Sequence, residues 1–368
     1  MRLVCDKNSL TNAISIVSRT VSPKSNLAFL EGIYLIADEE GLRLTGYNLE
    51  TGITVRMESR VRQSGECIMP TRMFSDVVRK LPDEIVTIEM DDSYRVTIQS
   101  GVAKVQLMAS ASDEYPQLPE VEEETAVSLP QNALRDMISG TLFAVSEDTA
   151  NPVYTGCLVE TEGNTINMVA IDGYRMAKRS FHSDCDFPAM SFIVPSSALR
   201  ELEKILTDSD EIARFCLGKK HISFSIGEAT LICRLLEGKF ADWRRFIPQS
   251  VPITLVANVA TITAAVERVG LIVSEKYKSP VRCLFSKDSV QFRTVTTIAA
   301  ANDGCSLAGD GKDTEVGFSC RYMLEALKAV PTTEVTLLLD DGLSPILLVP
   351  CEGETEDFTY LIQPVRLN

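Results

Sequence analysis

The sequence repeats one pattern three times. In each copy a strand end runs into an amphipathic helix, a break follows, and an acidic residue opens another strand. The copies read MPTRMFSDVVRKLPDEIVTIEM from residue 69, VPSSALRELEKILTDSDEIARFCL from residue 194 and FSCRYMLEALKAVPTTEVTLLL from residue 318. One pair of amphipathic helices would prove little. Three at near-equal spacing, each followed by the same kind of strand, indicate a repeated structural unit.

The repeated helices share charged positions as well as apolar ones. An acidic residue recurs at spacings of 125 and 124 residues, and a basic residue follows it three positions later. These residues are Asp76, Glu201 and Glu325, followed by Arg79, Lys204 and Lys328. Beyond each helix, the pairs predicted to open the next strand are Glu84-Ile85, Glu211-Ile212 and Glu334-Val335.

A second set of helices begins each unit, in DKNSLTNAISIVSRTV, PQNALRDMISGTLFAV and ANVATITAAVERVGLIV. Each of these stretches has an asparagine near its start (Asn8, Asn132 and Asn258), which is a common signal at a helix N-terminus. We therefore predict an α+β protein of three repeated domains, each with two helices packed on antiparallel sheets. The predicted domains are 1–125, 126–250 and 251–368, with linkers near PEVEEETAVS and PQSVPITL.

The charge of the predicted helices is opposite to that of the whole chain. The chain has a formal net charge of -15, yet its six helical stretches carry eleven basic and seven acidic residues. If the helices share one surface, that surface attracts phosphates while the remainder repels them. The simpler alternative is that these charges are merely solvated on exposed helix faces.

The sequence contains no recognisable catalytic or metal-binding motif. Its ten cysteines are scattered singly, it has two histidines, and it lacks GxSxG, HExxH, a Walker A sequence and GxGxxG in a strand–helix context. The acidic pairs Asp91-Asp92 and Asp340-Asp341 are weak candidates for Mg²⁺. We therefore expect a binding scaffold without catalytic residues, metal or cofactor. Without a signal peptide or an apolar membrane-spanning run, we expect a cytoplasmic protein.

One turn stands out in MVAIDGYRMAKRS, residues 168–180. Asp172-Gly173 predicts a hairpin turn, and three large side chains, Tyr174, Arg175 and Met176, follow it directly. The comparable stretch of the first repeat, TGYNLETG, lacks the Arg-Met pair. The sequence therefore suggests that the bulky cluster belongs to the middle domain alone and that the turn chemistry is not shared.

Together with the repeats, VAIDGYRMA, EGKFADWRRFIP and the C-terminal YLIQPVRLN resemble the bacterial DNA polymerase III beta-subunit family, the replicative sliding clamps. The resemblance spans the chain. It implies a head-to-tail homodimer that closes a ring around duplex DNA, with helices lining the hole and sheets outside. It also implies a processivity factor without catalytic activity. By resemblance, the dimer interface includes Leu107, Leu271 and Ile272, for which ordinary core packing is the alternative.

The resemblance further implies a pocket that binds short linear motifs of the polymerase, the clamp loader and repair proteins. Apolar walls would take Leu or Phe anchors. The matching positions are Asn151, Tyr154, Ile171, Gly173, Tyr174, Arg175, Met176, Ala241, Arg245, Phe246, Tyr277, Ser319, Tyr322, Met323, Leu343, Pro345, Leu361, Ile362, Gln363, Pro364, Val365, Arg366 and Leu367. Deleting residues 363–368 or replacing Arg175 by Ala is expected to abolish peptide binding and to leave the dimer intact.

Several of these positions depart from the family pattern. Ile171 stands where Thr is usual, Tyr174 where His is frequent, Ala241 where Pro is usual and Gln363 where Met is frequent, and the chain continues to Asn368. Each change alters the shape or polarity of the pocket, so we expect a peptide preference that differs from that of other members.

The predicted DNA contacts are basic residues of the helices and of one loop, and they would touch the backbone without reading sequence. They are Lys24 in SPKSN, and Arg72, Arg79, Lys80, Arg135, Arg200, Lys204, Arg321 and Lys328. The loop from Glu147 to Tyr154 could add contacts, but Glu147 and Asp148 would weaken them. Two alternatives remain open: an enzyme with a lone Cys or Asp in a cleft at a domain junction, and a monomeric adaptor that keeps the pocket but has lost ring closure.

Overall fold

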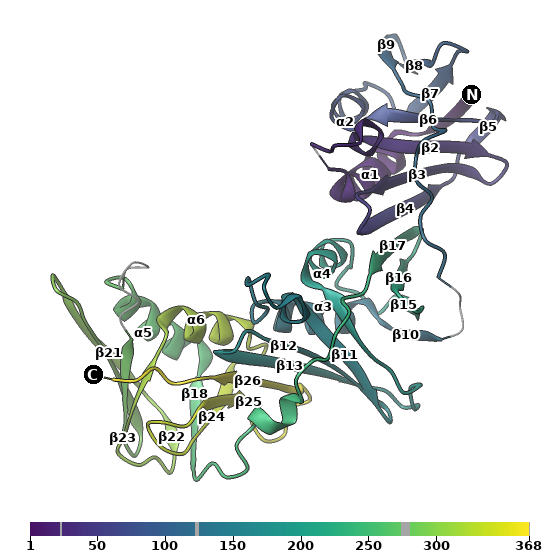
Figure 1. The fold of residues 1–368 in the computed structure, drawn as a ribbon. Coiled ribbons are helices and arrows are strands. Elements are labelled where there is room, and N and C mark those ends of the chain that lie inside the picture. Colours follow the sequence, from purple (N-terminus) through teal and green to yellow (C-terminus); the bar gives the residue numbers. More distant parts are fainter. Residues whose placement is uncertain (23, 122–124, 274–279, 368) are drawn as a thin grey trace. The chain divides into compact units, whose positions relative to one another are not determined.

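The computed structural model describes residues 1–22, 24–121, 125–273 and 280–367 (Figure 1). Two compact units make up the chain. The first comprises Met1–Leu134 and Arg200–Leu235, and the second comprises Arg135–Leu199 and Leu236–Asn368. The division runs through the middle repeat, because each of its two sheets joins a sheet of a neighbouring repeat.

The described residues contain six α-helices, two in each repeat, as the sequence predicts. They are α1 (Lys7–Val17) and α2 (Thr71–Arg79), α3 (Gln131–Leu142) and α4 (Ser196–Glu203), and α5 (Val259–Gly270) and α6 (Cys320–Ala329). Side-chain oxygens of Asp6, Asn258 and Ser319 cap α1, α5 and α6 by accepting a backbone N–H three residues later.

Each of these helices buries one face. In α1 the buried residues are Leu10, Ala13, Ile14 and Val17, at the spacing of one helix stripe. In α5 the same spacing recurs in Ile262, Ala265, Val266 and Val269. Burial of these stripes leaves the charged positions of the helices on their outer faces.

The first unit holds a five-stranded sheet, β5-β1-β7-β8-β9, and an eight-stranded sheet, β10-β15-β16-β17-β4-β3-β2-β6. Its strands are β1 (Arg2–Asp6), β2 (Gly32–Asp38), β3 (Gly41–Tyr47), β4 (Thr51–Met57), β5 (Arg60–Gln63), β6 (Gly65–Pro70), β7 (Ile85–Met90), β8 (Arg95–Ser100), β9 (Ala103–Met108), β10 (Ala126–Pro130), β15 (Ile212–Leu217), β16 (His221–Ile226) and β17 (Ala229–Arg234).

The second unit holds a nine-stranded sheet, β14-β11-β12-β13-β26-β25-β24-β18-β22, and a four-stranded sheet, β21-β20-β19-β23. Its strands are β11 (Gly156–Glu162), β12 (Thr165–Ile171), β13 (Arg175–His182), β14 (Ser191–Pro195), β18 (Ile253–Asn258), β19 (Val281–Phe285), β20 (Ser289–Val295), β21 (Ala300–Ser306), β22 (Ala308–Gly309), β23 (Thr314–Phe318), β24 (Glu334–Leu339), β25 (Ile346–Val349) and β26 (Phe358–Ile362).

Every repeat contributes two four-stranded arrangements, which we call its A-sheet and its B-sheet. The A-sheets are β1-β7-β8-β9, β10-β15-β16-β17 and β18-β24-β25-β26, and the B-sheets are β6-β2-β3-β4, β14-β11-β12-β13 and β23-β19-β20-β21. Successive repeats are joined because the last A-strand of one pairs antiparallel with the last B-strand of the repeat before it. These joints are β17 with β4 and β26 with β13.

Backbone hydrogen bonds fix the alignment of the repeats. The N–H at the start of the first helix donates to a carbonyl just before the strand that follows the second helix: Lys7 to Glu84, Gln131 to Glu211, and Val259 to Thr333. The third repeat is therefore shifted by one residue from the sequence alignment, since Glu334 begins its strand and corresponds to Ile85 and Ile212, not to Glu84 and Glu211. The ends of the two predicted linkers, 126–128 and 253–255, also prove to be strand residues.

The cysteines of the described residues are free thiols, and seven of the ten are buried. Burial raises the pKa of Cys5, Cys67 and Cys233 to about 12, so these thiols stay protonated and pack as small apolar groups. Within the described residues, no group of three or more His, Cys, Asp or Glu side chains could hold a metal ion. The part of the chain that the structure describes has no helix long and apolar enough to cross a membrane.

Candidate functional site

The turn between β12 and β13 is built by a side chain. Asp172 Oδ1 accepts the backbone N–H groups of Tyr174 at 2.9 Å and Arg175 at 3.0 Å. Gly173 has a φ of 90°, in the left-handed region that glycine adopts without steric cost. The turn therefore presents Tyr174, a residue that is 64% exposed.

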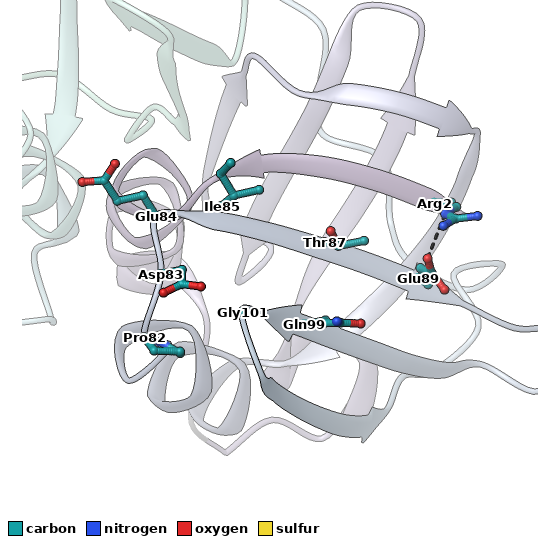
Figure 2. A pocket seen from close by; sticks show the side chains of 9 residues that line it. All are labelled: Arg2, Pro82, Asp83, Glu84, Ile85, Thr87, Glu89, Gln99 and Gly101. Carbon is teal, nitrogen blue, oxygen red and sulfur yellow. Dashed lines mark ion pairs between the residues drawn. The ribbon is translucent and has the colours of Figure 1, made fainter.

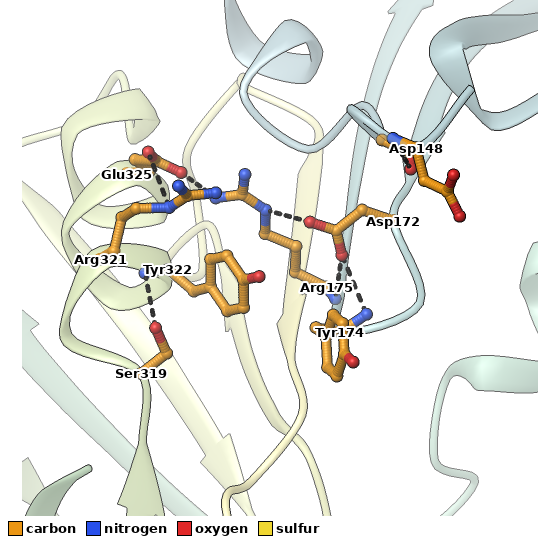
Figure 3. A network of polar contacts seen from close by, with 9 residues as sticks. Asp148, Asp172, Tyr174, Arg175, Ser319, Arg321, Tyr322 and Glu325 are labelled. Atoms are coloured by element: carbon orange, nitrogen blue, oxygen red, sulfur yellow. Dashed lines mark hydrogen bonds and ion pairs between the residues drawn. The ribbon is translucent and has the colours of Figure 1, made fainter. Parts of the chain in front are cut away.

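Arg175 has a buried guanidinium, although it follows an exposed residue. Its side chain is 4% exposed, and its Nε donates to Asp172 Oδ2 at 2.9 Å (Figure 3). Its Nη1 donates to Glu325 Oε2 on α6. The guanidinium also lies over the ring of Tyr322, 4.4 Å from the ring centre. Arg175 thus joins the second repeat to the third, and each of its charged contacts offsets the cost of burying the cation.

Two tyrosines meet beside this ion-pair network. The rings of Tyr174 and Tyr322 are stacked, with centres 6.1 Å apart and planes 24° from parallel. Burial raises the pKa of Tyr322, and the charge of Asp172 adds to the effect. The backbone N–H of Gln363 donates to the carbonyl of Tyr174 at 2.8 Å, so the C-terminal segment begins at this turn.

An apolar cluster lies on the same sheet as the turn. Ile171 and Met176, the residues flanking the turn, pack in one cluster with Leu361. The cluster is covered by the segment between the second and third repeats, which supplies Phe240 and Trp243. Tyr154 packs against it, with its ring 5.3 Å from that of Phe240.

The residues predicted for the peptide pocket differ in their exposure to solvent. Buried within the fold are Ile171, Arg175, Met176, Met323, Leu361 and Ile362. Half-buried are Tyr154, Ala241, Ser319, Tyr322, Pro345, Gln363, Pro364 and Leu367. Exposed are Asn151, Gly173, Tyr174, Arg245, Phe246, Leu343, Val365 and Arg366. Tyr277, together with Asn368, lies outside the described residues. The guanidinium of Arg175 is not offered to solvent, so its part in peptide binding stays a prediction.

Three models of the DNA polymerase III beta subunit match successive parts of the sequence: the N-terminal domain at residues 1–119, the central domain at 128–242 and the C-terminal domain at 244–366. A beta sliding clamp of Synechococcus elongatus is 31% identical, with all of both chains covered. The chain belongs to the DNA polymerase III beta-subunit family.

Solved members of this family have the same fold. The crystal structure of the DNA polymerase sliding clamp from Bacillus subtilis superposes with a TM-score of 0.95 at 28% identity, and all of both chains are covered. A sliding clamp from Pseudomonas aeruginosa bound to griselimycin gives a TM-score of 0.94 at 26% identity, again over both whole chains. The three repeats are therefore three beta-clamp domains of mixed helix and sheet.

The basic residues predicted to face DNA fall into two groups. Four of them lie within ion-pair distance of a carboxylate: Arg79 with Asp76 at 2.8 Å, Lys204 with Glu201 at 2.8 Å, Arg321 with Glu325 at 3.6 Å and Lys328 with Glu267 at 2.8 Å. Arg72, Lys80, Arg135, Arg200 and Lys24 are exposed and form no ion pair with any residue in the described ranges. The second group is the freer to meet phosphates.

The residues predicted for the dimer interface lie at the two open ends of the repeat series. Leu107 is half-buried on β9, the edge strand of the first A-sheet. Leu271, 84% exposed, follows α5 directly, and α5 is tied to the edge strand β21 by an ion pair between Arg268 and Asp303. Ile272 is half-buried beside it.

The structure also has an open hollow of about 590 Å³ over β1, β7 and β8 (Figure 2). An ion pair of 2.8 Å between Arg2 and Glu89 crosses one end, and Asp83 and Gly101 lie at the other. No residue predicted for the peptide pocket or for DNA lines it. Because Arg2 and Glu89 already neutralise each other, no charged group in that pair is left for a ligand.

Sequence reasoning missed four residues of the candidate site. The sequence predicts Asp172 as a turn former, but Asp172 also holds the Arg175 side chain. The sequence predicts Glu325 as a repeated acidic position, and that repetition is the signal that points to it. Phe240 and Trp243 are not among the predicted site residues, although large aromatic residues in a polar stretch such as EGKFADWRRFIP indicate that it packs against an apolar surface.

Proposed function

We propose that this protein is a DNA sliding clamp, a processivity factor that encircles duplex DNA and tethers other replication and repair proteins. The observation that carries the proposal is the full-length likeness to sliding clamps in sequence and in fold, over all three domains. The relatives are beta sliding clamps and DNA polymerase sliding clamps. The chain has the two features that such a role requires: helices with basic outer residues and an apolar cluster beside an exposed turn.

The arrangement of strands supports ring closure by a second copy. Inside the chain, each joint pairs the last A-strand of one repeat with the last B-strand of the repeat before it. This leaves β9, the last A-strand of the first repeat, and β21, the last B-strand of the third, as edge strands of their sheets. Pairing β9 of one copy with β21 of another repeats the internal joint and gives a head-to-tail homodimer. A heterologous interface of this kind closes a ring when the rotations complete a circle.

Non-specific attraction would hold the DNA inside this ring. The exposed cations of the helices would meet phosphates without reading bases, so no position along the duplex is preferred. Arg72, Lys80, Arg135 and Arg200 would contribute most, since no carboxylate of the described residues neutralises them. Topology, not affinity, would prevent escape.

The proposed partner site lies at the joint of the second and third repeats. Exposed Tyr174, Phe246, Leu343 and Val365 would form its accessible wall, over the buried Ile171, Met176 and Leu361. Short linear motifs with apolar anchors fit such a surface. We further propose that the protein has no catalytic activity of its own, that it needs no cofactor, that it acts in the cytoplasm, and that 1–125, 126–250 and 251–368 are its functional domains.

Retention on circular DNA tests the proposal. After loading onto nicked circles, the protein is expected to resist a wash with 0.5 M salt, because screening removes phosphate attraction but not topology. Cutting the circle with a restriction enzyme should release it, and a linear duplex of equal length is the control. Equal retention on linear DNA with free ends, or a strict monomer at micromolar concentration in light scattering, would contradict the proposal.

A further inference from the structure

Glu325 sits between a cation predicted to face DNA and a cation of the partner site. Its Oε2 accepts Arg175 Nη1 from the second repeat, and its Oε1 lies 3.6 Å from Arg321 Nε, one turn away on α6 (Figure 3). The two cations differ sharply in exposure: the Arg321 side chain is 58% exposed, whereas that of Arg175 is 4% exposed. Arg321 can leave this carboxylate for another anion, while Arg175 cannot.

The contact to Arg175 reaches the exposed turn. Arg175 holds Asp172 through Nε, and Asp172 in turn accepts the N–H groups that shape the turn before Tyr174. On its other side the Arg175 guanidinium supports the ring of Tyr322, on which Tyr174 stacks. A change in the strength of the ion pair between Glu325 and Arg175 therefore alters the contacts that hold Tyr174 and Tyr322 in place.

The same arrangement recurs at the other internal joint. Glu201, at the position in α4 that corresponds to Glu325, lies 3.7 Å from Arg19 of the preceding repeat and 2.8 Å from Lys204 of its own helix. In both joints one carboxylate of the second helix is shared between a cation across the joint and a more exposed cation of the same helix. Only at Glu325 does the cation across the joint belong to the predicted partner site.

We propose that Glu325 is a positioning residue that couples DNA in the ring to the partner site. Two guanidinium groups compete for one carboxylate, so a DNA phosphate that draws Arg321 away leaves the full charge of Glu325 to Arg175. Arg175 and Asp172 then hold the turn and the tyrosine pair more firmly. Because these groups are already ordered, the protein loses less conformational entropy when a peptide binds. DNA thereby raises the affinity for the peptide, and by linkage the peptide raises the affinity for DNA by the same factor. The inference rests on the proposed function.

The test measures peptide affinity with and without DNA on the full-length protein. The probe is a fluorescein-labelled decapeptide ending in Leu-Phe, titrated by fluorescence anisotropy, and the DNA is a 30-bp duplex at low salt. In the unchanged protein the duplex should lower the peptide Kd about two- to fivefold, the range expected from one partly exposed ion pair. In Arg321→Ala the peptide should bind without DNA as tightly as it binds the unchanged protein with DNA, and the duplex should have no further effect.

Lys328→Ala is the matched control, because Lys328 lies on the same helix but pairs with Glu267 instead of Glu325. It should weaken binding of the duplex as Arg321→Ala does, yet keep the shift in peptide Kd once the duplex is saturating. Glu325→Gln should weaken peptide binding and abolish the shift, with an unfolding midpoint measured alongside. An equal shift in Arg321→Ala and the unchanged protein, or no shift in the unchanged protein, overturns the coupling. Failure of the unchanged protein to bind the peptide at all would instead contradict the proposed partner site.

Discussion

The burial of the Arg175 side chain is the opposite of what its position in the sequence predicts. It follows an exposed tyrosine in a hairpin, where an arginine is ordinarily solvated, yet its guanidinium is enclosed by Asp172, Glu325, Tyr322 and Phe143. Local chemistry could predict the Asp-Gly turn, because Asx turns depend on neighbouring residues alone. It could not predict the burial, because α6 and Glu325 come from a segment 150 residues away.

Replacing Arg175 by Ala is expected to cost stability as well as peptide binding. The substitution leaves Asp172, 10% exposed, without its cation, and removing one partner of a buried ion pair costs about 3 kcal/mol. Urea unfolding of the full-length protein followed by circular dichroism measures the loss. Arg245→Ala is the control, since Arg245 is 83% exposed and its ion pair is with Asp242, three residues before it. Its expected change is within about 0.5 kcal/mol, and equal losses in the two variants would contradict the structural role of Arg175.

The hairpin turn before the last strand of each B-sheet is built in the same way in all three repeats. Asn48 accepts the N–H groups of Glu50 and Thr51, just as Asp172 accepts those of Tyr174 and Arg175, and Thr296 Oγ1 accepts that of Ala299. Side-chain capping of this turn is therefore shared, contrary to the sequence interpretation. Because Asn, Asp and Thr can all provide the accepting oxygen, chemically equivalent turns look unrelated in an alignment.

Helices and strands differ in how well the sequence predicts them here. The six helices were predictable, because caps and apolar stripes are local signals that recur at a fixed spacing. Pairing between repeats was not, because β17 with β4 and β26 with β13 join strands far apart in the chain. The position of Glu334 was not predictable for the same reason, because it is fixed by pairing with Asn258 and by the hydrogen bond from Val259 to Thr333.

The joint between β13 and β26 is expected to depend on pH through Asp357. Burial would raise the pKa of this carboxyl, but Lys178 at 3.0 Å and His182 at 2.9 Å outweigh burial and lower the pKa. The charge of Asp357 therefore stabilises the fold above the ordinary aspartate pKa of about 3.9, and this stabilisation is lost as the pH falls below that value. Asp357→Asn should lower the free energy of unfolding by about 1 kcal/mol at pH 7, because solvent screens a carboxyl whose side chain is 33% exposed.

The difference between Asp357→Asn and the unchanged protein should shrink as the pH falls from 5 to 3 in urea unfolding series. Asp184→Asn serves as the control, because Asp184 is exposed on the segment that follows β13. Its stability should follow that of the unchanged protein at every pH. A constant difference for Asp357→Asn across this range would show that the substitution acts through packing and not through charge.

At the scale of the whole molecule, the internal joints predict how two copies should pair. In the first joint Ile232 lies opposite Gly52, and in the second Leu361 lies opposite Met176. Ile232 and Leu361 each end a row of paired residues that crosses their A-sheet. The corresponding row of the first A-sheet ends on β9 at Gln106. Following the B-sheets, the residue of β21 that corresponds to Gly52 and Met176 is Ala300, which lies opposite Val295. Gln106 of one copy should therefore lie opposite Ala300 of the other.

A disulfide tests this pairing and the head-to-tail assembly together. The double variant Gln106→Cys with Ala300→Cys is expected to give, on mild oxidation, a covalent dimer of twice 40.5 kDa, because opposed antiparallel residues are within disulfide reach. Lys104→Cys with Ala300→Cys is the control, since it moves one thiol two positions along β9 to a diagonal separation of about 7–8 Å. The unchanged protein, oxidised in the same way, shows any cross-linking between its ten native cysteines. Cross-linking by Gln106→Cys alone would indicate that β9 pairs with β9 of the second copy, an interface of identical surfaces that leaves β21 unpaired and closes no ring.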